Sequence, residues 1–231
     1  MEAALVFWSR YGTGMARVAP FAIYILFLAL KPVVAKSFPE ADIRWLYALQ
    51  IGATAMALAV LRRQYVELAG AFALRAGQWL LAVVVGVMVF VAWINLDLPW
   101  LALGGTGGGG FDPSAPDGTL DWSLIVVRIA GAALVVPLME ELFWRSLVMR
   151  WIDQGDFLRL APAATSLRAW LVSSLVFGFE HDLWFAGIFA GVAYGWLYRR
   201  GGNLWLPIAG HAVTNLLLGV WVVATGSWRF W

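Results

Sequence analysis

The chain has 231 residues, of which 62% are apolar and 13% are charged, and it contains no cysteine. A soluble domain carries about 25% charged residues, so this composition excludes a soluble globule and predicts a protein whose solvent is mostly lipid. The lack of cysteine excludes disulfide bonds. The formal net charge is only +2 and the basic residues are dispersed between apolar runs, so we expect no nucleic-acid partner.

In chain order, residues 1–14 come first, with an apolar start but no signal-peptide features, and suit a helix lying in the membrane interface. Apolar runs follow, close to the length of about 20 residues that a helix needs to cross a bilayer. The predicted spans are 15–30, 45–61, 78–94, 122–149, 166–181, 183–198 and 204–225. We therefore predict an all-α, polytopic transmembrane helical bundle of about seven spans, within a range of about six to eight.

The absence of a repeat at a fixed period predicts a single integral membrane domain, residues 15–231. Its segment 120–225 carries the residues that are candidates for catalysis. The segment 99–119 is rich in glycine and has no basic residue, so it is predicted to be a flexible loop.

The basic residues divide unequally between the two predicted sides of the membrane. On the amino-terminal side lie eleven arginines: Arg10, Arg17, Arg62, Arg63, Arg75, Arg145, Arg150, Arg159, Arg168, Arg199 and Arg200. The opposite side has Lys31, Lys36, Arg44 and Arg229, while Arg128 lies inside a span, from which its side chain can snorkel outward. This excess predicts a cytoplasmic amino terminus and an outward Gly-rich loop. The excess of Arg over Lys and the abundant Ala favour a bacterial inner membrane.

Ionisable residues are costly inside spans, at about 2.5–3.5 kcal/mol each on insertion scales, and therefore mark candidate functional sites. Three such groups occur: Glu140 and Glu141 with Arg145, Phe177 with His181, and His211 with Asn215. Both histidines of the chain fall in these groups. Polar side chains also join helices inside membranes, but three groups together favour a reaction site.

Helical spacing suggests a role for each residue of the first group. Glu140 and Glu141 project about 100° apart, which predicts that they do not share one small site. Glu141 and Arg145 are four residues apart and can pair, leaving Glu140 free for chemistry. Pro137 frees the carbonyl of Ala133 and is expected to kink the helix just before Glu140.

The other two groups follow the same spacing. His211 and Asn215 present their polar ends to one side of a helix, and the ring of Phe177 lies where it can orient His181. Helix rise places these groups and Glu140 near the middle of the membrane or in its cytoplasmic half, so they can meet in one cavity. The two acids that flank His181 are expected to be solvated.

These residues resemble the motifs Glu-Glu-x-x-x-Arg, Phe-x-x-x-His and His-x-x-x-Asn of the CAAX protease and bacteriocin-processing (CPBP, abortive-infection) family of membrane proteases. The resemblance covers about residues 120–225 and implies a glutamate-dependent intramembrane endopeptidase, without metal or cofactor, that hydrolyses a peptide or a membrane-anchored protein. Glu140 with His181 would activate water, and His211 with Asn215 would donate hydrogen bonds to the oxyanion. Glu141, Arg145 and Phe177 would support them, in a cavity open to the cytoplasmic side.

Three other interpretations stay open. Glu140, His181 and His211 could bind zinc in a metalloprotease, although the chain has no His-Glu-x-x-His helix. The chain could also be a non-proteolytic membrane scaffold of the same fold, or a transporter whose buried charges mark an ion path. The sequence indicates neither the identity of the substrate nor the oligomeric state.

Overall fold

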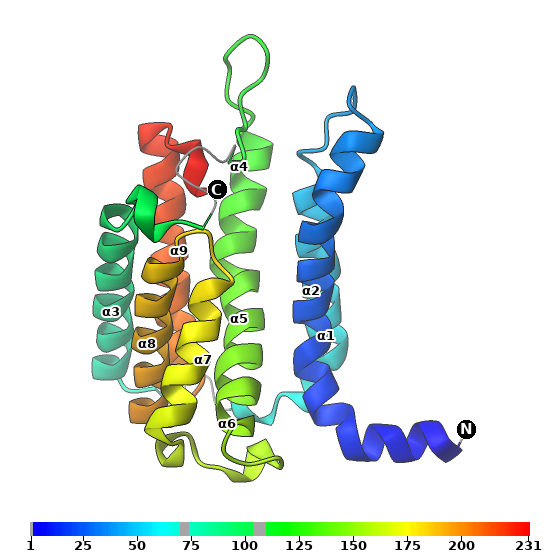
Figure 1. Ribbon diagram of the computed structural model, residues 1–231, viewed down its shortest axis with the longest axis vertical. Helices are drawn as coiled ribbons and strands as arrows, with labels where there is room; N and C mark the ends of the chain where they lie inside the picture. The colour runs from blue at the N-terminus through cyan, green and yellow to red at the C-terminus, as the bar shows by residue number, and fades with distance from the viewer. Residues whose placement is uncertain (1, 70–73, 104–109) are drawn as a thin grey trace.

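The computed structural model describes residues 2–69, 74–103 and 110–231, and the side chains from residue 12 onward. Within them, all extended regular structure is helical (Figure 1). The helices are α1 (Glu2–Ser37), α2 (Leu46–Leu61), α3 (Ala76–Asn95), α4 (Trp122–Ala130), α5 (Val136–Glu141), α6 (Met149–Trp151), α7 (Leu167–Phe179), α8 (Trp184–Gly201) and α9 (Trp205–Thr225). Because α4, α5 and α6 belong to one continuous helical rod, Trp122–Trp151, seven long segments result, and the predicted all-α bundle is confirmed.

Four of the helices in the described part are long and apolar enough to cross a membrane: Gly12–Ser37, Ala76–Asn95, Trp122–Trp151 and Trp205–Thr225. α7 is apolar but shorter. Large apolar side chains such as Leu26, Met56 and Leu134 are exposed on the outside of the bundle, as expected where lipid replaces water. The protein is therefore an integral membrane protein.

The two ends of the chain lie at opposite ends of the bundle, as an odd number of crossings requires (Figure 1). The first part of α1 runs across the bundle axis before the helix turns along it. α1 packs with α2 on one side of the rod that contains α4 to α6, whereas α3 packs along α9 and α7 along α8 on the other. The rod therefore stands between these two helical groups.

Two π-helical turns interrupt this rod, at Gly131–Val135 and at Leu142–Val148, and they bracket α5. In the first π turn, amide donors bond to the carbonyl five residues earlier, and Pro137 has no amide hydrogen to donate. The carbonyl left free is therefore that of Ala132, not Ala133 as the α-helical spacing predicted. Asn215 Nδ2 on α9 donates to the Ala132 oxygen at 2.8 Å. The proline thus creates the acceptor that connects α9 to the turn preceding the glutamates.

A buried polar network joins α1 to the end of the rod. The Arg17 side chain is fully buried, forms an ion pair with Glu67, and donates to the carbonyl oxygens of Thr13 and Gln64. Ser146, in the second π turn, donates to the same Glu67 carboxylate. The sequence analysis placed Arg17 among the charges that face the cytoplasm, whereas the structure places it inside the bundle as a structural cation.

The Gly-rich segment, residues 99–119, is described by the structure in part. Residues 104–109 lie outside the described residues. Residues 110–121 form a hydrogen-bonded hairpin in which Ala115 N donates to Thr119 O and Asp121 N donates to Pro113 O. The Phe111 amide also donates to the carbonyl oxygen of Trp231 at 3.0 Å. This part is therefore a loop that carries turn hydrogen bonds of its own and one contact with the carboxyl terminus.

Close packing of α3 on α9 depends on Gly86. A methyl group at this position would collide with the carbonyl oxygen of Gly210 and lie 2.8 Å from Val213 Cβ. We expect Gly86→Ala to lower the free energy of unfolding by about 1–3 kcal/mol, because the two helices would have to separate. Thermal unfolding in detergent measures this effect. Gly77→Ala on the same helix is the control, since nothing lies within 4 Å of its added methyl group; equal destabilisation of both variants would contradict the prediction.

Candidate active site

The predicted site residues meet at one cavity of about 190 Å³ inside the helical bundle. Its lining includes Glu140, Phe177, His181, His211 and Asn215, which come from α5, α7, the turn after α7, and α9. Glu141 and Arg145 lie directly behind this lining. The structure thus brings together all three sequence groups, which lie on different helical segments of the chain.

Glu141 is the centre of the buried ion cluster. Its Oε2 lies 3.1 Å from Arg145 Nε, and both side chains are fully buried, as the four-residue spacing predicted. The directions of these atoms do not give a hydrogen bond, so the contact is an ion pair. Its Oε1 accepts a hydrogen bond from His211 Nδ1 at 3.1 Å. One carboxylate therefore serves both a guanidinium and an imidazole.

The two glutamates do not both point into the cavity, in agreement with their predicted separation of about 100°, because Glu140 lines it and Glu141 does not, but one imidazole lies between them. His211 Nδ1 contacts Glu141, and His211 Nε2 lies 3.9 Å from Glu140 Oε2. The 100° separation of the two residues is compatible with this arrangement because the imidazole presents one nitrogen to each carboxylate. α9 supplies that ring from the side facing both residues.

Glu140 is the free carboxylate of the cluster. Its side chain is 6% exposed, and its Oε2 is a buried oxygen with no hydrogen-bond partner among the described residues. Buried polar oxygens are normally hydrogen-bonded, so an unpartnered one facing a cavity marks a place where a polar ligand or water is bound. This placement agrees with the expectation that Glu140 is left for chemistry.

The tautomer of His181 follows from its contacts. Its Nδ1 donates to the carbonyl oxygen of Phe177 at 2.8 Å, because a carbonyl can only accept. Nε2 is then the nitrogen with a lone pair available to a ligand. The ring centroid of Phe177 lies 4.8 Å from that of His181, and the ring of Trp93 packs edge-on at 5.4 Å. These contacts hold the imidazole, including the predicted contact with Phe177.

His211 is positioned by residues that the sequence analysis did not single out. The ring of Tyr194 on α8 stacks on the imidazole with centroids 4.7 Å apart. The Tyr194 hydroxyl donates to Thr214 Oγ1 at 2.8 Å, and Thr214 Oγ1 donates to the Gly86 carbonyl at 2.8 Å. Thr214 could have been found, because it is a polar residue one helical turn after His211. Tyr194 had no such signal among many aromatic residues.

Asn215 reaches the cavity with part of its hydrogen-bonding capacity already used. One of its two amide hydrogens goes to the Ala132 carbonyl, and the other remains available, as does the amide oxygen. Asn215 is therefore both a support for the first π turn and a potential donor to a ligand.

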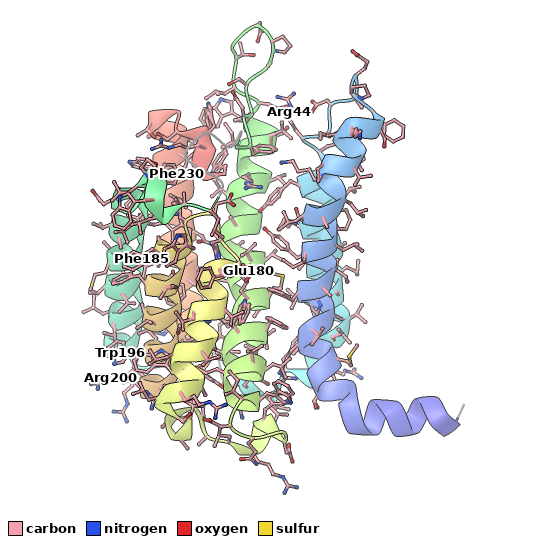
Figure 2. The ribbon with its side chains drawn as sticks, viewed as in Figure 1. Arg44, Glu180, Phe185, Trp196, Arg200 and Phe230 are labelled. Carbon is pink, nitrogen blue, oxygen red and sulfur yellow. The ribbon has the colours of Figure 1, made fainter. Side chains whose placement is uncertain are left out.

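Glu180 is not solvated as expected. It is half-buried, and Trp144 Nε1 donates to its Oε2 at 2.9 Å. It lies about midway along the bundle in Figure 2 and interacts electrostatically with Glu140. The sequence analysis missed it because the chain leaves α7 at Phe179, which turns residue 180 back toward the rod. The neighbouring Asp182 is exposed, as predicted.

The cavity does not extend toward the arginine-rich end of the bundle. Its lining continues through Arg128 and Tyr47 to Phe230 and Trp231 at the carboxyl terminus. Tyr47, Arg128 and Trp231 also line a second cavity of about 470 Å³ between the α1–α2 pair and α4. This lining does not agree with two predictions taken together, a cytoplasmic arginine-rich end and a cavity open to the cytoplasmic side. The Arg145 cluster and the Arg17 network fill the bundle between the glutamates and the arginine-rich end.

Among residues 2–69, 74–103 and 110–231, no group of three or more His, Cys, Asp or Glu side chains is arranged to hold a metal ion. Of the atoms in the zinc alternative, the Nδ1 atoms of the two histidines are engaged, whereas Glu140 Oε2 has no hydrogen-bond partner among the described residues. His181 Nδ1 is committed to Phe177, and His211 Nδ1 is committed to Glu141.

Fold and site together define an all-helical integral membrane protein with a carboxylate–imidazole cluster in its interior. Residues 122–217 match the family model described as Rce1-like, type II CAAX prenyl endopeptidase Rce1-like. This segment contains every predicted site residue, and the match confirms the resemblance found in the three motifs. The chain is therefore similar to this family over residues 122–217. No curated protein and no solved structure matches the chain.

Proposed function

We propose that the protein is an intramembrane endopeptidase in which Glu140 activates a water molecule for attack on a peptide bond. The observation that carries the proposal is the difference between the contacts of the two glutamates. Glu141 is neutralised by Arg145 and bonded to His211, whereas Glu140 faces the cavity with an unpartnered oxygen. A carboxylate without a partner in an enclosed polar site is suited to general-base chemistry.

The first chemical step uses Glu140 and His181. Glu140 accepts a proton from water while the water oxygen forms a bond to the carbonyl carbon of the substrate. His181 Nε2 is left free by the Nδ1 contact with Phe177. It accepts a hydrogen bond from the second O–H of the water and so orients the water molecule. Glu140 then returns its proton to the leaving amine as the carbon–nitrogen bond breaks, so that the carboxylate is regenerated.

His211 and Asn215 stabilise the oxyanion of the tetrahedral intermediate. Because His211 Nδ1 already donates to Glu141, Nε2 carries a hydrogen only when the imidazole is cationic. In that form, two carboxylates and two cations balance in the cluster. The second amide hydrogen of Asn215 is the other donor. Loss of one oxyanion donor typically lowers kcat by about 10²- to 10³-fold.

We propose a peptide or membrane-anchored protein as the substrate, and a bacterial inner membrane with a cytoplasmic amino terminus as the location. Of the eleven arginines on the amino-terminal side, Arg17, Arg145 and Arg150 are buried and hold the bundle together. The remaining eight still exceed the four basic residues of the other side. With this orientation, the cavity opens toward the outer face.

Comparative peptidomics tests the proposed activity. Membranes containing the wild type are expected to yield a cleaved peptide or protein whose uncleaved form accumulates with Glu140→Gln, because the amide cannot accept the proton from water. Glu40→Gln is the matched control, since Glu40 is exposed and far from the cavity in the chain. Unchanged cleavage with Glu140→Gln would contradict the protease and favour the scaffold.

The zinc and transporter alternatives have their own tests. Activity of the purified protein that survives a chelator, in a sample without stoichiometric zinc, would remove the metalloprotease interpretation. Ion flux into liposomes that depends on Glu140 would favour the transporter instead.

A further inference from the structure

Arg128 is an intramembrane cation for which the proposed hydrolysis has no use. It lies on α4, half-buried, on the same rod as Glu140 and twelve residues before it. In the part of the chain that the structure describes, no carboxylate forms an ion pair with its guanidinium and no oxygen accepts a hydrogen bond from it. Its neighbours are aromatic: the guanidinium carbon is 4.2 Å from the ring centroid of Tyr47 and 5.3 Å from that of Phe111. Its five N–H donors therefore remain available.

The position of Arg128 is equally specific. It lines both the site cavity and the second cavity, so it stands where the two adjoin. The sequence analysis expected its side chain to snorkel outward, but the structure places it against the cavity walls. A charged residue in a membrane span normally faces a partner or a water-filled path, because its insertion is unfavourable. The partner that would satisfy this guanidinium has to come from outside the described chain.

Two of the other charged residues of the second cavity, Arg44 and Asp112, are already engaged. Arg44 forms an ion pair with Asp42 at 2.7 Å and donates to the Ser114 carbonyl; its hydrogen bonds lower the pKa of Asp42 to about 2. Asp112 accepts a hydrogen bond from the Ser114 amide. Lys31 adds a further positive charge to the lining. An anion that enters this cavity therefore meets two positive charges, the ammonium of Lys31 and the free guanidinium of Arg128, and only Arg128 also lines the site cavity.

We propose that Arg128 binds a carboxylate of the substrate and so determines which peptide bond reaches Glu140; this inference rests on the proposed protease function. Twelve residues of helix separate Arg128 from Glu140 by about 18 Å along the axis. An extended peptide spans about 3.3–3.6 Å per residue, so the carboxylate binds about four to six residues from the cleaved bond. A planar guanidinium matches a carboxylate with two parallel hydrogen bonds. The carboxylate belongs either to the peptide's own carboxyl terminus or to an Asp or Glu side chain.

Peptide binding to the inactive Glu140→Gln protein tests the role of Arg128 without any cleavage. The probes are fluorescent decapeptide libraries in four forms: with a free carboxyl terminus or a terminal amide, and with Asp or Asn fixed at one interior position. We expect the acid forms to bind about 10- to 100-fold more tightly than their neutral counterparts, and Arg128→Gln to remove that preference. Arg128→Lys should restore part of it. Arg159→Gln is the control, because that arginine is exposed, is already paired with Asp156 and lines neither cavity.

The outcomes separate the sources and the hypotheses. A preference confined to the free terminus identifies the terminal carboxylate, and a preference for interior Asp identifies a side chain. Equal binding of acid and neutral libraries, or a preference that survives Arg128→Gln in a folded protein, overturns the proposal. Cleavage of the same libraries by the wild-type protein, which retains Glu140, is measured separately by mass spectrometry. If cleavage fails while binding depends on Arg128, the protease function is wrong and the carboxylate site stands.

Discussion

Purified Glu140→Gln protein is expected to lose about 10²- to 10⁴-fold in kcat on the substrate found by peptidomics, with KM nearly unchanged. Glutamine keeps the shape of the side chain but cannot take a proton from water. Stability should not fall, because Glu140 Oε2 has no hydrogen-bond partner to lose and the substitution removes a buried charge. Steady-state kinetics and thermal unfolding in the same detergent measure both quantities.

Glu180→Gln is the informative comparison for this prediction. Glu180 is a second carboxylate near the cavity, but its Oε2 accepts a hydrogen bond from Trp144. We expect this variant to keep kcat within about tenfold of the wild type, since its carboxylate does not hold the water. A larger loss for Glu180→Gln than for Glu140→Gln would reverse the assignment of the general base.

Arg145→Met is expected to lower the free energy of unfolding by about 3–5 kcal/mol. The substitution leaves the fully buried Glu141 carboxylate without its cation, and an uncompensated buried charge is strongly destabilising. The double variant Glu141→Gln with Arg145→Met should recover most of that loss, because no unpaired charge remains. Arg159→Met is the control: its pair with Asp156 is exposed and should contribute no more than about 1 kcal/mol.

Activity separates the two roles of Glu141 in the same series. The double variant should fold but stay inactive, because His211 Nδ1 loses the carboxylate that orients it. Denaturant titration in detergent and kcat measurements give the two readouts. A double variant with wild-type activity would show that Glu141 serves the structure alone.

Several features of the fold could be predicted from the sequence because the membrane simplifies them. Apolar runs of about 20 residues must be helical in lipid, since every backbone amide needs a partner within its own segment. For this reason six of the seven helices lie close to their predicted ranges, whereas α1 (Glu2–Ser37) extends well beyond the predicted span 15–30 at both ends. The Glu141–Arg145 pair was also predictable, because a four-residue spacing on a helix is local geometry. His181 was expected at the end of a span, and the structure places it in the turn that follows α7.

Features that depend on contacts between helices were missed. The first π turn precedes Pro137 and is contacted by Asn215, which is 78 positions away from the proline in the chain, so α-helical spacing gave the wrong free carbonyl. The stacking of Tyr194 on His211 likewise needs α8 and α9 side by side. Arg17 was misplaced because its partner, Glu67, lies on another segment.

Charged residues make up only 13% of this chain, and by themselves they indicated that it is a membrane protein. Their positions also indicated which few residues are candidates for catalysis. A charge in an apolar span is unfavourable enough that its presence is informative without any structure. Only the tertiary structure decided which charges are paired and which are free. Pairing depends on distances between helices that no spacing along one helix contains, and these distances left Glu140 and Arg128 facing the cavities.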